Sequence, residues 1–441
     1  MRTVMRTPRL LVAILFMLCA ALCANVAAAQ GLTLQIVNGV PSAIPITVVP
    51  FGQQGSGPAA PVDVAQIVGM DLARCGKFRT LPNSEIVQSP TTGAQIKFAT
   101  WQQLKQDYIV VGSASYDGGV LKVDYQLWDV NKQQMLLQNT VARQGSDLRR
   151  AGHEIADQIY QKIIGVRGAF DTRIAYVTMV GLGNNAQYAL VVADSDGYNP
   201  QTVVRSHEAL LSPTWSPNGQ ELAYVSFESG NSAIYIQNIA TGARRLVSSR
   251  PGINGAPRFS PDGKRLAVSL SFQGNPEIYV MDLGSGALTR LTHNLAIDTE
   301  PSWAPDGQSI IFTSDRSGKP QLYEIPAGGG SPQRITFQGQ YNADVAVDYD
   351  GKKLAMVQGN GNVYRIAVMD RSTGGQEIFV SPGNLDDSPS WAPNASMLLY
   401  AATEGPRGVL YSVSADGRVR QRLVLSDGDV REPAWGPYRT P

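Results

Sequence analysis

The sequence predicts a mainly β protein in which a small α+β domain precedes a six-bladed β-propeller. Three observations lead to this prediction. An aromatic residue followed by a Pro-Asp/Asn-Gly turn recurs every 44 residues, short β-branched and aromatic runs fill the intervals, and residues before 165 lack the repeat. Four strands in a repeat of this length match one blade of a PD40/WD40-like propeller.

The first 29 residues have the pattern of a cleaved signal peptide. Arg2, Arg6 and Arg9 give a positive start, LLVAILFMLCAALC gives an apolar middle, and AAA at 27–29 is a small-residue cleavage site. A membrane anchor is the alternative, but the apolar stretch is short and ends in small residues. We therefore expect the chain to be exported, with residues 1–29 removed.

Charge and cysteine usage exclude several classes of protein. The chain has 37 Lys+Arg against 36 Asp+Glu, and loss of the three signal arginines leaves 34 against 36, a charge of −2. Without a basic run, a general nucleic-acid or membrane-surface binder is not expected. Cys19 and Cys23 lie in the signal and lack a lipidation context. Cys75 then has no disulfide partner, and a packed small hydrophobe is favoured over a reactive thiol.

Residues 30–165 form the predicted α+β domain, with 165–170 as a linker to the propeller over 166–441. The expected elements are a buried strand (46–51), a helix ended by Gly (62–76), a hairpin around Asp117-Gly118-Gly119 (108–130), a third strand (134–142) and a helix (146–165). Ser146 is the expected cap of that last helix. Its apolar face comprises Leu148, Ala151, Ile155, Ile159 and Ile163.

The mature N-terminus is predicted to form a strand with one strongly apolar face. Leu32, Leu34 and Ile36 alternate there with Thr33, Gln35 and Val37. A terminal strand either pairs within its own domain or adds to the sheet of a partner. The sequence leaves both possibilities open.

The recurring motif explains how each blade begins. Its copies are WSPNG (215), FSPDG (259), WAPDG (303), VDYDG (347), WAPNA (391) and WGPYR (435). Pro fixes φ near −65° and Gly accepts positive φ, so the innermost strand turns into the second one. The aromatic residue then fills the wedge between blades. Val347, Tyr349 and Ala395 depart from the motif, and differently shaped turns are expected there.

The number of motifs and of strand sets predicts how the ring of blades closes. The strands that start near 173 have no motif before them, and the motif at 435 has no strands after it. We therefore expect VREPAW (430–435) to supply the innermost strand of the first blade and complete a six-bladed ring. Such closure protects strand edges that would otherwise be open for aggregation.

No catalytic constellation is found. The three histidines, His153, His207 and His293, are scattered, and each is interpreted as a surface or packing residue. The chain has no G-x-S-x-G elbow, P-loop, H-E-x-x-H or dinucleotide fingerprint. DSDG (194–197) resembles part of a calcium loop but lacks the downstream glutamate, so a hairpin turn is the better interpretation.

One non-catalytic pattern concerns the residue three positions before each motif. These residues are Ser212, Ala256, Glu300, Asp344, Ser388 and Glu432, with Asp298, Asp386 and Asp387 close by. In a propeller they meet at one mouth of the central channel. They are either solvated loop residues or an electronegative rim that attracts a cation or a partner's basic side chains.

Several strings outside the repeat motif resemble the TolB family of the Tol-Pal system. They are IPITVVPF (44–51), GVRGAFDTRIAYV (165–177), NGAPRFSPDGKRLA (254–267), IYVMDLGSGALTRLT (278–292), DTEPSWAPDG (298–307) and DGDVREPAWGPY (427–438). The resemblance covers the whole mature chain. It implies a non-enzymatic periplasmic protein that supports outer-membrane integrity and outer-membrane invagination during cell division.

The resemblance also implies partners and contact residues. The lipoprotein Pal docks at one mouth of the channel, the mature N-terminal strand engages TolA, and bacteriocins use the same mouth as Pal. Other outer-membrane lipoproteins and porins are further implied partners of a monomer that neither spans a membrane nor binds nucleic acid. The family's Pal-contact residues fall on Asn254, Gly255, Ala256, Thr299 and Glu300, and Asp344 and Glu432 extend this rim. Ile253 departs from the histidine of well-known members.

Two other classes of function are weighed against this one. A hydrolase or lyase acting in the channel needs clustered histidines or carboxylates with partners, which the scattered histidines do not provide. A cation- or carbohydrate-binding periplasmic propeller is the remaining alternative. No cofactor is expected, with a weak divalent-cation site at the acidic mouth left open.

Overall fold

The computed structural model describes residues 34–36, 43–423, 425 and 428–439. The predicted signal peptide lies outside the described residues, as do Leu32, Thr33 and Val37 of the predicted N-terminal strand. No helix of the described part is both long and apolar enough to cross a membrane.

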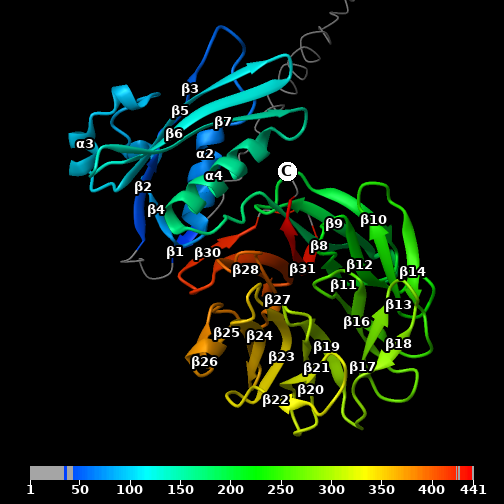
Figure 1. Cartoon of the computed structure of the whole chain (residues 1–441). Helices are drawn as coiled ribbons and strands as arrows, with labels where there is room; N and C mark the ends of the chain where they lie inside the picture. Colours follow the sequence, from blue (N-terminus) through cyan, green and yellow to red (C-terminus); the bar gives the residue numbers. More distant parts are fainter. Residues whose placement is uncertain (1–33, 37–42, 424, 426–427, 440–441) are drawn as a thin grey trace, which may run out of the picture. The chain divides into compact units, whose positions relative to one another are not determined.

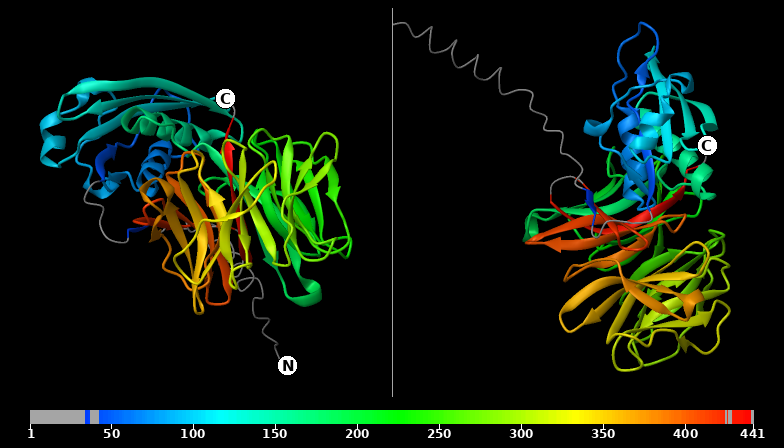
Figure 2. Two further views of the ribbon diagram at one scale, coloured as in Figure 1. Left: turned by 60° about the horizontal axis from the view of Figure 1, so that its bottom comes forward. Right: turned by 90° about the vertical axis from the view of Figure 1, so that its left-hand side faces the viewer.

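Six antiparallel sheets form the predicted propeller (Figures 1 and 2). The first three blades are β31 (Asp429–Tyr438), β8 (Thr172–Val180), β9 (Gln187–Asp194) and β10 (Gln201–Ser206); β11 (Leu210–Trp215), β12 (Glu221–Ser226), β13 (Ala233–Asn238) and β14 (Arg244–Ser248); and β15 (Asn254–Phe259), β16 (Arg265–Leu270), β17 (Glu277–Asp282) and β18 (Leu288–Arg290).

The remaining three blades repeat the same order, innermost strand first. They are β19 (Asp298–Trp303), β20 (Ser309–Ser314), β21 (Gln321–Pro326) and β22 (Gln333–Arg334); β23 (Tyr341–Val347), β24 (Lys353–Asn360), β25 (Val363–Asp370) and β26 (Gln376–Phe379); and β27 (Asp387–Trp391), β28 (Met397–Glu404), β29 (Arg407–Ser414) and β30 (Val419–Arg422). Short 3-10 turns η3 (Gly183–Asn185) and η4 (Arg371–Thr373) interrupt two connections.

The C-terminal strand closes the ring as predicted. Strand β31 pairs with β8 in antiparallel register, from Asp429 opposite Met179 to Tyr438 opposite Thr172. The innermost strand of the first blade therefore comes from the opposite end of the propeller sequence, and the six-bladed prediction is confirmed.

The motif tryptophans lie between blades, as expected. Trp215, Trp303 and Trp391 are each at most 8% exposed. Each indole Nε1 donates a hydrogen bond of 3.0 Å to a carbonyl in the innermost strand of the preceding blade, namely those of Ala434, Arg258 and Ala346. An aromatic residue at this position thus supplies both the apolar filling and one polar link between blades.

The expectation that two turns would differ in shape is wrong. In WAPDG, the Gly307 N–H donates to the Ala304 carbonyl, and Gly351 and Ala395 make the same bond to Asp348 and Ala392. Because this bond uses only backbone groups, Tyr349 does not alter it. Ala395 adopts the left-handed conformation, with φ of 54°, that glycine takes elsewhere, at a cost of about 1–2 kcal/mol.

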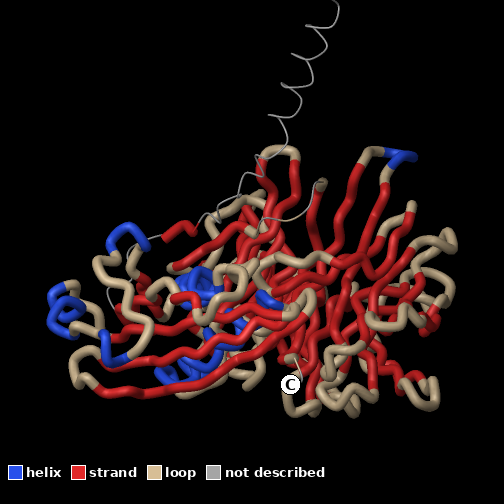
Figure 3. The backbone as a smooth tube through the Cα atoms, turned by 90° about the horizontal axis from the view of Figure 1, so that it is seen from above, coloured by secondary structure: helices blue, strands red, loops and turns tan. Residues whose placement is uncertain are grey.

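The N-terminal domain is a mixed sheet with two helices on one face (Figure 3). Its strands are β2 (Ile44–Val48), β3 (Gly52–Gln53), β4 (Phe78–Thr80), β5 (Tyr108–Asp117), β6 (Val120–Asp129) and β7 (Gln134–Gln144), ordered β4-β2-β5-β6-β7 with β3 beside β5. Its helical elements are α2 (Val64–Arg74), α3 (Phe98–Gln103), α4 (Leu148–Ile164), η1 (Asn83–Glu85) and η2 (Gly93–Gln95). Helix α3 was not predicted.

Helix α4 packs its apolar face into the core of the N-terminal domain, and one prediction about this helix is wrong. Leu148, Ala151, Ile155 and Ile159 are buried against the sheet and α2, each large side chain contributing about 1.5–3 kcal/mol. The N-cap residue is Asp147 rather than Ser146, and its side chain makes no capping bond. The helix ends at Ile164 and is capped by Gly165, with φ of 93°; the domain boundary there stays a prediction.

The predicted N-terminal strand is present over its described residues and pairs with neither of the expected sheets. Strand β1 (Leu34–Ile36) lies antiparallel to β30, with Leu34 opposite Gln421 and Ile36 opposite Val419. It is therefore a fifth strand on the outer edge of the sixth blade. The sequence predicts the strand but not this partner.

Candidate functional site: an acidic cavity at the mouth of the channel

The six residues three positions before each motif share an unusual backbone conformation. All have positive φ, between 47° and 54°, although none is glycine. At each of them the pairing between the innermost and second strands shifts register, which is a β-bulge. They are Ser212, Ala256, Glu300, Asp344, Ser388 and Glu432. A left-handed residue costs about 1–2 kcal/mol, and all six blades retain it.

The six bulge residues line one cavity of about 640 Å³. The sequence predicted that they would meet, but the spacing gave no sign of the bulge. The charged side chains of the lining are five carboxylates and one guanidinium: Glu300, Asp344, Asp386, Asp387, Glu432 and Arg258. The cavity therefore carries an excess of negative charge.

Burial and mutual repulsion perturb these carboxylates. Burial raises the pKa of Asp344 well above its ordinary value, and nearby Glu300 raises it further while Arg258 opposes the shift. Burial likewise raises the pKa of Glu432, of Asp387 and of Asp386. A cation entering the cavity would relieve this repulsion, so the site favours positively charged ligands.

Two rim glutamates also connect neighbouring blades. The Asp344 N–H and the Thr313 hydroxyl each donate to Glu300 Oε2 at 2.8 Å. The Ser212 N–H donates to Glu432 Oε2 at 3.1 Å. Each carboxylate thus holds the bulge of the next blade in place through its Oε2 atom. The sequence analysis missed this structural role.

The residues around Asn254 separate into buried and exposed positions. The Asn254 side chain is fully buried, donating to the carbonyls of Ser232 (3.0 Å) and Arg250 (2.6 Å). It therefore shapes the connection between blades and presents no contact surface. Ile253 is 50% exposed, while Gly255, Ala256 and Thr299 are half-buried.

Exposed apolar side chains accompany the rim, and of these the sequence analysis named only Ile253. They lie in the connections from the outermost strand of one blade to the innermost strand of the next, just before the bulges. They are Ile253, Leu295, Ile297, Phe337 and Leu385, all at least 50% exposed. Apolar residues around a polar centre are typical of a protein-interaction surface. Only a blade-by-blade alignment of connections of unequal length could have found them.

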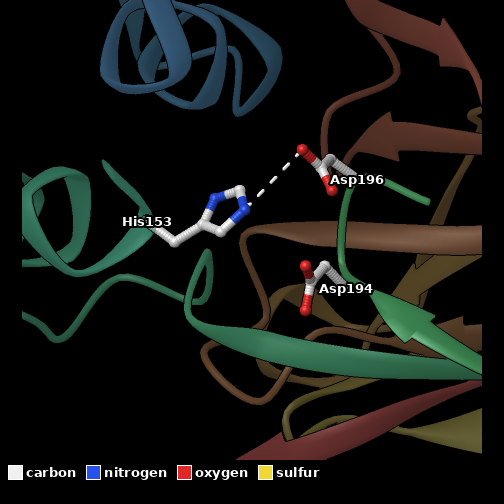
Figure 4. Close-up of side chains that lie close together, drawn as sticks. All are labelled: His153, Asp194 and Asp196. Carbon is white, nitrogen blue, oxygen red and sulfur yellow. Dashed lines mark ion pairs between the residues drawn. The ribbon is translucent and has the colours of Figure 1, made fainter. Parts of the chain in front are cut away.

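The three histidines have different environments. His207 and His293 are exposed, as predicted. His153 is 1% exposed and lies beside Asp194 and Asp196 (Figure 4), so it is a packing residue, in charged surroundings that the sequence did not predict. The turn predicted over 194–197 is confirmed by a bond from the Gly197 N–H to the Asp194 carbonyl.

Comparison with known proteins identifies the family. Residues 32–136 match the model of the TolB amino-terminal domain, and residues 160–439 match that of the TolB beta propeller domain. The chain belongs to the TolB family. A Tol-Pal system protein TolB from Xanthomonas campestris pv. campestris (strain B100) is 67% identical over 413 residues, which is 93% of this chain and 94% of the relative.

A solved TolB structure has the same fold. The crystal structure of TolB from Acinetobacter baumannii is 42% identical, covers 92% of this chain and all of that chain, and superposes with a TM-score of 0.83. Tol-Pal system protein TolB from Xanthomonas oryzae pv. oryzae (strain MAFF 311018) is 67% identical over the same share of the chain. The chain is thus a TolB-family component of the Tol-Pal system.

Proposed function

We propose that this TolB-family protein is a non-enzymatic periplasmic adaptor that binds Pal through the propeller mouth and TolA through its N-terminal strand. In this role it supports outer-membrane integrity and outer-membrane invagination during cell division. The observation that carries the proposal is the acidic cavity with five carboxylates and one arginine, bordered by exposed apolar connections.

Each part of this surface has a role in docking Pal. The negative potential attracts basic side chains and speeds encounter. The apolar connections supply the surface area that loses contact with water when Pal binds. Ile253 and Leu295 are among these residues. Bacteriocins, porins and other outer-membrane lipoproteins with a similar basic and apolar face would compete for the same mouth.

The N-terminal strand provides the second contact. Only three described residues of β1 pair with β30, so the strand can exchange its edge pairing for that of TolA at modest cost. Pal docking influences TolA binding if Pal has unequal affinity for the paired and released states of this strand.

A tryptophan scan of the mouth tests the Pal site. Thr299→Trp and Ala256→Trp place bulk at the rim and should abolish Pal binding measured by calorimetry, with melting temperature retained. Thr202→Trp, on the exposed outermost strand β10, is the matched control and should bind Pal normally. Unchanged Pal affinity in both rim variants would place the docking surface elsewhere.

Deletion of residues 30–38 tests the TolA site. The expected result is loss of TolA binding with Pal binding retained at a shifted affinity. Retained TolA binding would exclude the strand as the TolA site, and an unchanged Pal affinity would exclude coupling between the two sites.

A divalent-cation- or carbohydrate-binding role is the second candidate, favoured by the repulsion among the carboxylates around Asp344. Calcium titration followed by calorimetry should show binding that is lost in Asp344→Asn with Glu432→Gln. A glycan that bound the mouth in competition with Pal would support the carbohydrate alternative. If neither calcium nor a glycan binds in the micromolar to millimolar range, this candidate is excluded.

A further inference from the structure

A buried ion cluster joins the N-terminal domain to the first blade. His153 of α4 has its Nδ1 2.6 Å from Asp71 Oδ2 on α2, and its Nε2 3.7 Å from Asp196 Oδ2 in the turn after β9 (Figure 4). The ring is thus between a carboxylate of its own domain and one of the propeller. Nε2 is buried without a hydrogen-bond acceptor at bonding distance.

Two arginines of the N-terminal domain contact the same turn. Arg74 donates to the Ser195 carbonyl at 3.0 Å and to the Ser195 hydroxyl at 2.8 Å, and it also pairs with Asp71. Arg149 pairs with Asp196 Oδ2 at 2.6 Å. Because the side chains of Arg74 and Asp71 are about 98% buried, these contacts are shielded from solvent. Loss of one contact therefore weakens the others.

His153, Asp194 and Asp196 are close enough together to raise the question of a metal ion. Their carboxylate oxygens are already occupied. Asp196 accepts from Arg149 and from the Tyr198 N–H, and Asp194 accepts from Arg439 and Asn199. A divalent cation would have to displace guanidinium groups and would leave excess positive charge in a buried site, which is unfavourable.

A proton on His153 fits the cluster better than a metal. We infer that His153 is an imidazolium that acts as a proton-dependent latch, holding helices α2 and α4 to the turn at 194–197 of the first blade. With both nitrogens protonated, Nδ1 donates to Asp71 and Nε2 faces the charge of Asp196. A neutral ring with its proton on Nδ1 would instead direct a lone pair at that carboxylate.

The charged groups around the ring agree with this assignment. The ring interacts with Asp71 on α2 and with Asp196 and Asp194 on the first blade. Arg74 on α2, Arg149 on α4 and Arg439 after β31 are each paired with one of these carboxylates, and Asp157 lies one turn further along α4. Burial alone would lower the pKa of His153, but Asp71 and then Asp196 raise it to about 9. Burial would raise the pKa of Asp196, yet His153 and Arg149 lower it overall.

The direction of the pH dependence follows from this shift. The folded pKa of His153 lies above the ordinary value of 6.5, so its contribution to stability is complete below pH 6.5 and is lost as pH rises through 9. Asp157, whose pKa burial raises to about 7, titrates mainly below this window. Measurements between pH 7.5 and 9.5 therefore report on the histidine.

Spin-label distances across the latch test the inference. Cysteines introduced at exposed Lys122 in the N-terminal domain and Arg245 in the second blade are labelled in the chain without residues 1–29, which lacks Cys19 and Cys23; Cys75 is 1% exposed and resists labelling. Double electron–electron resonance should give one narrow distance distribution at pH 6.5 and a broader one at pH 9.5. His153→Gln should be broad at both pH values, and Asp196→Asn should match it.

The same experiment includes a control variant, and two outcomes would contradict the latch. His207→Gln, an exposed histidine, should behave as the unmodified protein. Thermal unfolding should show a fall in Tm of about 2 °C or more from pH 7.5 to 9.5, absent in His153→Gln. A narrow, pH-independent distribution in both cluster variants would overturn the latch. Binding of one equivalent of added zinc chloride, lost in His153→Gln, would overturn it in favour of a metal site.

Discussion

Carboxylates are concentrated both at the channel mouth and in the interdomain cluster. In the cluster each carboxylate is paired with an arginine of the chain, whereas at the mouth this is not so. At the mouth, Glu300, Asp344, Asp386, Asp387 and Glu432 share the single arginine of the lining. In the cluster, Asp71, Asp194 and Asp196 each have an arginine partner. The difference is that the carboxylates of the cluster are balanced by arginines of the chain, whereas most of the charge at the mouth is not balanced by the residues that line it.

The largest effect is expected from removing the strand that contributes to both regions. Deletion of residues 428–441 removes Glu432 from the mouth, Arg439 from the cluster and the innermost strand of the first blade. The truncated chain should lose the cooperative thermal transition of the propeller. A truncated protein that melts like the intact one would contradict the closure topology. The full chain with Arg431→Ala, at an exposed position of β31, is the control.

Asp71→Asn breaks the neutralised cluster from one side. Because it leaves His153 and Arg74 buried without their carboxylate, we expect unfolding free energy to fall by about 3–5 kcal/mol. Urea denaturation at pH 7 measures this, with Asp117→Asn in the exposed hairpin as control. A loss below about 1 kcal/mol would mean that water or rearranged side chains replace the carboxylate.

Charge reversal at Glu300 removes an attracting charge and also the bonds that it accepts from Asp344 and Thr313, so both Pal binding and stability should change. Glu300→Lys adds a cation to the attracting surface, so association with Pal should slow by about tenfold and lose salt dependence. Stopped-flow kinetics at two ionic strengths measure both quantities. Asp306→Lys, in the turn after the same strand, should associate at the unmodified rate. Equal rates for the two variants would remove the argument for steering by the mouth.

The smallest effect is expected from neutralising a carboxylate that has no counter-charge of its own. Asp344→Asn should increase stability at pH 8 by up to about 1 kcal/mol, because the ionised form is disfavoured by burial and by Glu300. The folded pKa is raised, so this gain should vanish as pH falls below the unfolded pKa. Urea denaturation at pH 8 and pH 3.5 checks the sign, and destabilisation at pH 8 would show that the carboxylate is compensated.

The two regions also differ in how far the sequence predicts them. The mouth follows from a repeat of fixed length, because equal spacing places Ser212 and Glu300 at equivalent positions in their blades. The cluster has no such regularity: Asp71, His153 and Asp196 come from three elements whose proximity depends on domain packing. The pairing of β1 with β30 was unpredictable for the same reason, since any exposed edge could accept that strand.

The closing strand has a consequence for the order in which this protein is made. The partner of residues 172–180 is the segment 429–438, which follows every other described strand in the sequence and is therefore synthesised after them. Until that segment arrives, the first blade has no innermost strand and the ring cannot become cooperative. A chain that terminates before residue 429 therefore leaves the first blade open and accessible to proteases.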